Sequence, residues 1–269
     1  MAITQRASFA TDTEESMEFH VPCSPPPRSL KKAIRNSSAS AKKWIASRLS
    51  GTSKPITDEE ALNLDFDMEE ESEQDEDLLE LIQHKPWVAE ERANYDDEVV
   101  YWYAKNQPKS FRARYNFDKY GNQFPLQRVI ALGASLRTVE AVVTAYPPAL
   151  LYRHRVHRST PLHSACAFPS LFQVGVISFL LDLNFEAIEQ TNGNAFLPIH
   201  NACCASVPSP IGLEAIQILV EAHPRSVLMT NKLGETPLQA AKRNPDSLPD
   251  VISYLQEMQE QEQLEDEEQ

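Results

Sequence analysis

The stretch Thr160-Pro161-Leu162-His163-Ser164-Ala165-Cys166 decides the fold of this chain, because variants of its first four residues recur along the sequence. The other copies are Phe124-Pro125-Leu126-Gln127, Leu197-Pro198-Ile199-His200 and Thr236-Pro237-Leu238-Gln239, and successive prolines lie 36, 37 and 39 residues apart. A threonine side chain caps the free backbone amides of a helix. A proline fits the first helical position, where its missing N–H costs nothing. Each copy therefore predicts the start of a helix.

A second pattern follows each copy and predicts a second helix. Apolar residues spaced i, i+3, i+4 begin 14 to 18 residues after each motif proline. The four sets are Val139, Val142 and Val143; Ile177, Leu180 and Leu181; Ile216, Leu219 and Val220; and Val251, Tyr254 and Leu255. Pro147 and Pro224 mark the end of two of these helices, because proline cannot continue a helix. One such helix pair cannot bury its apolar stripe alone, so we expect an all-α stack of pairs.

Glycines precede three of the four motifs. Gly121, Gly193 and Gly234 fall where a tight turn leads into the next helix. Such a turn needs a positive φ, which glycine adopts without steric cost. We therefore expect these three glycines to occupy the left-handed positions of the turns.

Motif and turn together resemble ankyrin repeats. The resemblance is carried by Thr160 to Cys166, by Leu197 to Cys203, and by Asn231-Lys232-Leu233-Gly234-Glu235-Thr236-Pro237-Leu238. It implies an ankyrin-like solenoid of stacked helix pairs with projecting turn fingers. The units are longer than the family's roughly 33 residues. Gln127 and Gln239 stand at the motif histidine, and Arg158 stands at the turn glycine.

The resemblance divides the chain into regions. The repeat domain is expected over residues 85–260, with a degenerate cap at 85–123 and units at 124–159, 160–196, 197–235 and 236–260. Flanking regions are a basic disordered arm (1–55), an acidic disordered segment (56–80) and an acidic tail (261–269). The residues expected to maintain the repeat are Pro125, Thr160, Pro161, Leu162, His163, Pro198, His200, Gly234, Thr236 and Pro237.

Charge is concentrated at the ends of the 269-residue chain. Of 39 acidic residues, 13 lie in residues 56–80 and 7 in residues 257–269, and neither stretch holds a Lys or Arg. The net charge of −14 therefore resides mostly outside the repeats. No stretch predicts a membrane span or a secretory signal, and four cysteines give no disulfide framework. We expect a cytoplasmic or nuclear location.

Two His and Cys pairs are candidates either for a metal site or for a structural role. His163 with Cys166 and His200 with Cys203 supply the ligand types of a zinc site. Equivalent residues of stacked helices lie about 10 Å apart, however, which is too far for one ion. The resemblance implies that the histidines serve the turns and that the cysteines serve packing. We expect no metal, cofactor or small-molecule substrate. Since no catalytic or phosphate-binding motif occurs either, we expect no enzyme.

Cationic residues in the expected fingers favour protein binding. Successive fingers project side by side, so their charges form one basic strip that attracts an acidic partner. The partner is another protein or the chain's own segment Asp58 to Glu80, and the overall acidity disfavours nucleic acid. The predicted partner-binding residues are Arg112, Arg114, Lys119, Arg153, His154, Arg155, His157, Arg158, Asn231 and Lys232.

Two alternatives use the amino-terminal residues. A nuclear co-regulator would use Lys31-Lys32 and Lys42-Lys43 for import, and the alternating acidic and apolar run from Leu62 to Met68 for recruitment. A peripheral membrane adaptor would place the basic, apolar stretch from Leu30 to Leu49 on anionic lipid. The favoured hypothesis is a scaffold that binds a protein partner through its fingers and the concave face of the stack.

Overall fold

The computed structural model describes residues 75–83, 95–117, 122–168, 173–205 and 210–268, and these residues are mostly α-helical. The predicted all-α class is therefore confirmed. The α-helices are α4 (Glu76–Ile82), α6 (Asp97–Asn106), α7 (Pro125–Ala131), α8 (Leu136–Ala145), α9 (Pro161–Ala167), α10 (Gln173–Leu183), α11 (Pro198–Cys204), α12 (Pro210–Ala222), α13 (Pro237–Arg243) and α14 (Pro249–Glu268). The predictions for residues 1–55 lie outside the described residues.

Short 3-10 helices and one small sheet complete the described part. The 3-10 helices are η1 (Pro108–Arg112), η3 (Pro147–Leu151), η4 (Phe185–Ile188) and η5 (Pro224–Leu228). Strands β1 (Tyr115–Asn116) and β2 (Asn122–Gln123) pair antiparallel, with Tyr115 opposite Gln123.

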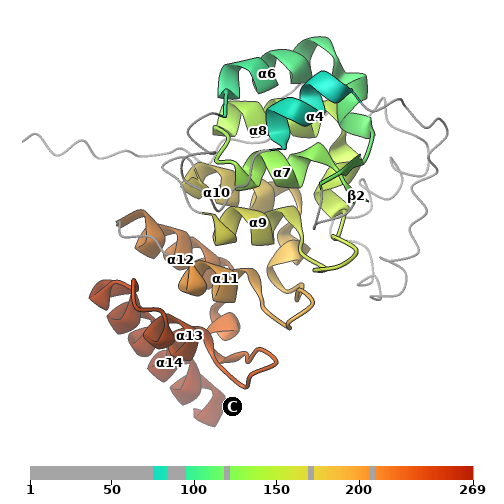
Figure 1. The fold of residues 1–269 in the computed structure, drawn as a ribbon. Helices are drawn as coiled ribbons and strands as arrows, with labels where there is room; N and C mark the ends of the chain where they lie inside the picture. The colour runs from blue at the N-terminus through green and yellow to red at the C-terminus, as the bar shows by residue number, and fades with distance from the viewer. Residues whose placement is uncertain (1–74, 84–94, 118–121, 169–172, 206–209, 269) are drawn as a thin grey trace, which may run out of the picture.

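The helices are arranged as consecutive pairs. A short first helix packs on the second helix that follows it in α4–α6, α7–α8, α9–α10, α11–α12 and α13–α14. First helices contact the next first helix, from α4 through α7, α9 and α11 to α13, and second helices do the same from α6 to α14. Figure 1 shows the pairs following one another from α4 and α6 at the top to α13 and α14 at the bottom.

The motif residues start the first helices as expected. Thr160 Oγ1 accepts a hydrogen bond from the amide of His163, and Thr236 Oγ1 accepts one from Gln239, with a proline next in each helix. The second helices α8 and α12 end at Ala145 and Ala222, two residues before a proline that begins a 3-10 helix. Local capping chemistry therefore sets these helix boundaries.

The apolar sets predicted for the second helices lie in the core. Every member of the first three sets is buried, and in the fourth Val251 and Leu255 are buried while Tyr254 is half-buried. These residues belong to one apolar cluster that runs from Leu78 to Leu255. The core is therefore continuous along the stack, and each pair depends on its neighbours for burial of its apolar face.

The left-handed turn position lies three residues before the motif proline in three successive units. Arg158, Ala195 and Gly234 occupy it with φ of 53°, 56° and 74°. The expectation is confirmed for Gly234 and wrong for Gly193, because Ala195 has the positive φ in that turn. Gly193 instead allows close approach of two turns, since a Cβ there would lie 3.2 Å from the carbonyl oxygen of His157. Gly121 lies outside the described residues.

The amino-terminal boundary of the stack differs from the prediction. Residues 76–80 of the segment expected to be disordered form α4, and α4 is the first helix of the first described pair. Leu78 and Ile82 are fully buried there. Asp75 caps the helix by accepting from the amide of Leu78, and acidic residues suit the first turn of a helix. Leu78 and Ile82 are spaced i, i+4 at the end of the acidic run, and their burial makes these residues part of the stack.

The carboxyl-terminal boundary also differs. Residues 261–268 continue α14, so the stretch that the sequence analysis assigned to an acidic tail beyond the repeat domain is helical. Glutamine and glutamate are good helix formers, and two pairs of them bond at i, i+4 spacing on this helix. Gln256 Nε2 lies 3.2 Å from Glu260 Oε1, and Gln261 Nε2 lies 3.4 Å from Glu257 Oε1.

A buried arginine holds α4 against α7. Arg128 of α7 donates from Nε to the carbonyl of Ile82 at 3.0 Å and from Nη2 to that of Gln83 at 2.8 Å. Its guanidinium also lies 5.1 Å from the centre of the Phe117 ring. A cation at the carboxyl end of a helix satisfies the last carbonyls and opposes the helix dipole. Arg128 therefore connects α7 to α4, a helix that begins in the acidic run and lies more than 40 residues earlier in the sequence.

Substitutions at the left-handed position test how much its backbone strain changes the free energy of unfolding. We expect Gly234→Ala to lower the free energy of unfolding by about 1 kcal/mol, because no atom lies near the added Cβ and only the backbone is strained. Ala195→Gly removes the same strain, so it raises stability by about 0.5 kcal/mol after the entropy cost of glycine in the unfolded chain. Urea denaturation measures both, and equal signs for the two changes would contradict the assignment.

Removing the Arg128 guanidinium tests the docking of α4. Arg128→Met leaves two carbonyls without this donor, so we expect α4 to lose about 2 to 4 kcal/mol of docking free energy. Hydrogen exchange should accelerate in residues 75–83 and stay unchanged in α11 and α12. Arg137→Met is the control, because Arg137 forms an exposed pair with Glu98 that contributes about 1 kcal/mol or less. Equal protection of α4 in both variants would rule out the proposed anchor.

Candidate functional site

Four connections project from the same side of the stack (Figure 1). We call them fingers 1 to 4 and define them as residues 115–123, 153–159, 192–196 and 231–235. Each finger precedes a first helix, so its base is fixed by the start of that helix. In finger 1, residues 118–121, which include the predicted binding residue Lys119, lie outside the described residues.

The bases of fingers 2, 3 and 4 are each tied to the preceding first helix by one repeated hydrogen bond. The residue two positions after the motif proline donates to the carbonyl two positions before the next motif proline. Gln127 Nε2 donates to Ser159 O at 2.7 Å, His163 Nε2 to Phe196 O at 2.9 Å and His200 Nε2 to Glu235 O at 3.2 Å. The glutamine that replaces the motif histidine thus makes the same contact. This series fixes fingers 2, 3 and 4.

Both histidines of this series are neutral. The Nδ1 atoms of His163 and His200 accept from the amides of Thr160 and Leu197, so the proton is on Nε2. Burial lowers the pKa of His163 to about 4, and burial also lowers the pKa of His200. Protonation of either Nδ1 would eliminate its acceptor role at the start of the helix.

Neighbouring fingers also bond to each other through their backbones. The amide of Gly193 donates to His157 O at 2.7 Å, and the amide of Lys232 donates to Asn194 O at 3.2 Å. Tyr152, immediately before finger 2, donates from its hydroxyl to Asn122 O in finger 1 at 2.9 Å. The four fingers therefore form one connected row.

Several residues predicted to bind a partner instead shape the fingers. His154 is buried, and its Nδ1 accepts from the amides of Val156 and His157 at 3.2 and 3.0 Å. Asn231 is buried and accepts through Oδ1 from the amides of Leu233 and Glu235. Arg153 donates to the carbonyl of Thr191 in the approach to finger 3. These side chains fold the row and leave little surface for a partner.

The tips of the fingers expose both cations and aliphatic groups. Val156 and Leu233 are each 65% exposed. The exposed cationic or histidine side chains beside them are Arg155, His157 and Lys232, and Arg112 is exposed just before finger 1. Arg158 is half-buried at its left-handed position. The fixed row thus ends in tips that combine positive charge with apolar surface.

The arginines of fingers 1 and 2 converge on two tyrosines. Burial raises the pKa of Tyr146 and of Tyr152, and nearby guanidinium groups act against that rise. Arg112 and Arg114 act on Tyr146, whereas Arg114 and Arg155 act on Tyr152. We call Arg112, Arg114 and Arg155 the arginine cluster. Arg112 and Arg114, which lie just before finger 1, thus act on the same pair of tyrosines as Arg155 of finger 2.

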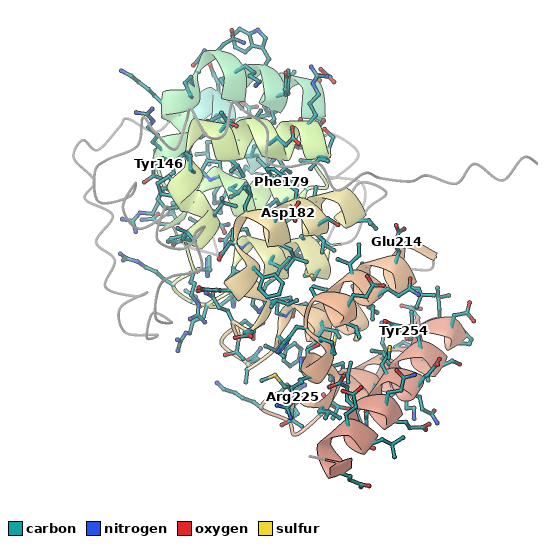
Figure 2. All side chains as sticks on the ribbon, turned by 180° about the vertical axis from the view of Figure 1, so that it is seen from behind. Tyr146, Phe179, Asp182, Glu214, Arg225 and Tyr254 are labelled. Atoms are coloured by element: carbon teal, nitrogen blue, oxygen red, sulfur yellow. The ribbon has the colours of Figure 1, made fainter. Side chains whose placement is uncertain are left out.

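Acidic side chains lie on the second helices. Glu98 of α6, Asp182 of α10 and Glu214 of α12 are exposed. Figure 2 shows Glu214 at the edge of the stack away from the connections. Residues 107–117 and 148–160, by contrast, contain no Asp or Glu. The stretches that carry Arg112, Arg114 and Arg155 therefore contain no acidic residue, whereas α6, α10 and α12 each expose a carboxylate.

The first helices expose less surface than expected. All seven residues of α7 are buried, and in α9 only Ser164 and Ala167 are even half-buried. Exposed side chains occur on α13, at Gln239, Lys242 and Arg243. Among α7, α9 and α13, exposed side chains are therefore concentrated on α13.

The His and Cys pairs serve the fold. Both ring nitrogens of His163 and His200 already have backbone partners, as described above. Cys166 and Cys203 are buried, and burial raises the pKa of both thiols. Across residues 75–83, 95–117, 122–168, 173–205 and 210–268, no three His, Cys, Asp or Glu side chains group as metal ligands.

Some structural side chains gave no signal in the sequence pattern. Asn201 Nδ2 donates to His163 O at 3.1 Å, and Asn244 Nδ2 donates to Cys203 O at 3.2 Å, so each links neighbouring first helices. Asn192 shapes finger 3 as Asn231 shapes finger 4, by accepting from the amides of Asn194 and Phe196. Alignment of the four units would have found Asn192, because it lies six residues before a motif proline, as Asn231 does.

No protein-family model matches this sequence, and no curated protein matches it either. None of the helices in the described residues combines the length and the apolar composition needed to cross a membrane.

Replacing His163 by glutamine tests its neutral, bonded state. The lowered pKa means that the unfolded chain binds more protons between pH 6.5 and 4. Stability is therefore complete above about pH 6.5 and falls by up to about 3 kcal/mol toward pH 4. At the equivalent positions Gln127 Nε2 donates to the next finger and Gln239 Oε1 accepts from the amide of Thr236, so glutamine supplies each of these bonds in one unit. For His163→Gln we therefore expect near wild-type stability at pH 7.5 and about 2 kcal/mol less acid loss by pH 4.5. An unchanged acid profile in urea titrations would exclude this role.

Proposed function

We propose that this chain is an ankyrin-type repeat protein whose fingers bind a protein partner. Support for the family comes from the motif at four positions, the stacked helix pairs and the repeated hydrogen bond from each first helix to the next finger. The left-handed position three residues before the proline adds to this support, because it recurs in three successive turns. Such folds fix a surface and leave its side chains free to match a ligand.

The observation that carries the proposal is the contrast between fixed finger bases and exposed finger tips. Hydrogen bonds from His163, His200 and the neighbouring fingers hold the bases, so little conformational entropy remains to be lost on binding. Val156 and Leu233 are exposed at the tips without a structural role in these hydrogen bonds. A preorganised row with apolar and cationic tips is suited to binding.

The side chains of the row define the partner's chemistry. Arg155 and Lys232 at the tips favour carboxylates, and Val156 and Leu233 favour apolar side chains between them. The partner surface is therefore an acidic protein segment with interspersed apolar residues. Exposed charge pairs are screened by salt, so binding should weaken as ionic strength rises. The buried face of α7 takes no part, and α13 extends the surface.

Charge reversal at the tips tests the proposal. The double variant Arg155→Glu, Lys232→Glu should lose partner binding at least tenfold at low salt, because it replaces attraction by repulsion at two fingers. Affinity capture with the full chain, followed by quantitative mass spectrometry and titration of the captured protein, measures the loss. Lys105→Glu on α6 is the matched control, since Lys105 is exposed on a second helix.

Circular dichroism should show equal helicity for the three proteins. A partner retained by the finger variant, or lost equally with Lys105→Glu, would place the binding surface elsewhere and overturn the proposal.

A further inference from the structure

The chain immediately before α4 leaves the described structure beside finger 1. Ser110 Oγ donates to Asp75 Oδ2 at 2.7 Å, and the amide of Asp75 lies 3.3 Å from the hydroxyl of Tyr115. Tyr115 is the first residue of finger 1, and its hydroxyl donates to Ser110 O at 2.8 Å. Burial raises the pKa of Tyr115 to about 12, so this tyrosine stays neutral and keeps its donor. Asp75 therefore has a fixed position at the base of finger 1.

The anchor of Asp75 lies next to the arginine cluster in sequence and in space. Arg112 and Arg114 are located between Ser110 and Tyr115, the two residues that bind Asp75. Arg155 of finger 2 acts with Arg114 on Tyr152, and the Tyr152 hydroxyl also donates to Asn122 O of finger 1 at 2.9 Å. Asp75, the first described residue of the acidic run, is thus fixed beside the stretch of chain that carries Arg112 and Arg114.

The segment from Asp58 to Gln74 has the complementary charge and pattern. It contains nine acidic residues and no basic residue. Within it Leu62, Leu64, Phe66 and Met68 alternate with Asn63, Asp65 and Asp67. An extended chain places alternate side chains on opposite sides, so it can direct apolar groups to one surface and carboxylates to another. Val156, exposed between Arg155 and His157, offers apolar surface beside the cations.

From these observations we infer that residues 58–74 bind the arginine cluster of the same chain in an extended conformation and cover fingers 1 and 2. This inference rests on the binding role proposed for the fingers and names one ligand for them. An external acidic partner then competes with the chain's own segment.

The segment is long enough to reach these fingers. Asp67 lies eight positions before Asp75, and an extended chain of that length spans at most about 28 Å. Stacked helices lie about 10 Å apart, so the part of the segment nearest Asp75 already reaches fingers 1 and 2.

Tethering makes a weak contact sufficient. A short tether gives an effective concentration of about 1 mM, so an intrinsic Kd of about 0.1 mM leaves the cluster covered roughly nine-tenths of the time. The same arithmetic lowers the apparent affinity of a competing ligand about tenfold. Binding of the chain's own segment therefore raises the affinity that an external partner needs in order to occupy the arginine cluster.

The first experiment adds the segment back as a peptide. A fluorescent peptide of residues 57–74 is titrated into the full chain and into a full-chain variant whose nine acids at 58–73 are changed to Asn or Gln. We expect the amide variant to bind the peptide about tenfold more tightly than the wild type, and salt at 0.5 M to weaken that binding at least tenfold. Adding Arg112→Glu and Arg155→Glu to the amide variant should abolish binding, whereas Lys105→Glu should not.

A scrambled peptide of the same composition, with its apolar residues contiguous, separates pattern from charge. Weaker binding of the scrambled peptide supports the extended, alternating mode. Equal binding of both peptides, equal affinity of wild type and amide variant, or binding that survives reversal of both arginines overturns the inference. Each of these failures leaves the capture of an external partner by fingers 2 and 4 intact, so the two proposals fail separately.

A second experiment detects the contact within one chain. Arg155→Lys introduces an amine that carbodiimide couples to a carboxylate in direct contact with it. We expect a cross-link from position 155 to an acid within 58–73, with a yield independent of protein concentration. The amide variant with the same substitution is the control and should lose the cross-link. Absence of this product, or a yield that rises with protein concentration, contradicts self-coverage.

Discussion

The hydrogen bond from each first helix to the next finger is the constraint on which the rest of the structure depends. Gln127, His163 and His200 each join one first helix to the carbonyl two residues before the next motif proline. Apolar burial alone holds helix pairs together but leaves their connections free, because the hydrophobic effect has no direction. A directional bond at the same position of each unit aligns the fingers, and their backbone contacts then join them into a row.

The sequence pattern predicted the features that depend on neighbouring residues, namely the helix starts and the apolar faces. The motif proline with its threonine starts α9 and α13, and the i, i+3, i+4 sets lie in the core, because both effects act within one or two helical turns. The substitution of glutamine for histidine at position 127 was visible in the sequence. The sequence did not show that Gln127 makes the same hydrogen bond as the motif histidine, because that bond depends on where the carbonyl of Ser159 lies.

What sequence could not predict depends on contacts between distant residues. Composition made residues 76–80 part of an acidic, disordered segment, yet Leu78 and Ile82 are buried and Arg128 holds their helix from more than 40 residues away. At the candidate site, the sequence analysis selected Arg112, Arg155 and Lys232, which are exposed. It also selected His154, Asn231 and Arg153, which shape the fingers. A side chain's charge does not reveal whether it points to solvent or to a backbone amide of its own turn.

The position of α4 changes the meaning of the acidic run that precedes it. A flexibly attached acidic tail would distribute its charge over the whole molecule, with little preference for the finger side over any other basic group. With Asp75 bonded to Ser110 and to Tyr115, the run instead starts at a fixed point beside the arginine cluster. In the proposed contact, the fold and not dilution would set the local concentration of carboxylates there. The buried contacts that complete the core at the first helix pair also fix Asp75, from which the proposed contact starts.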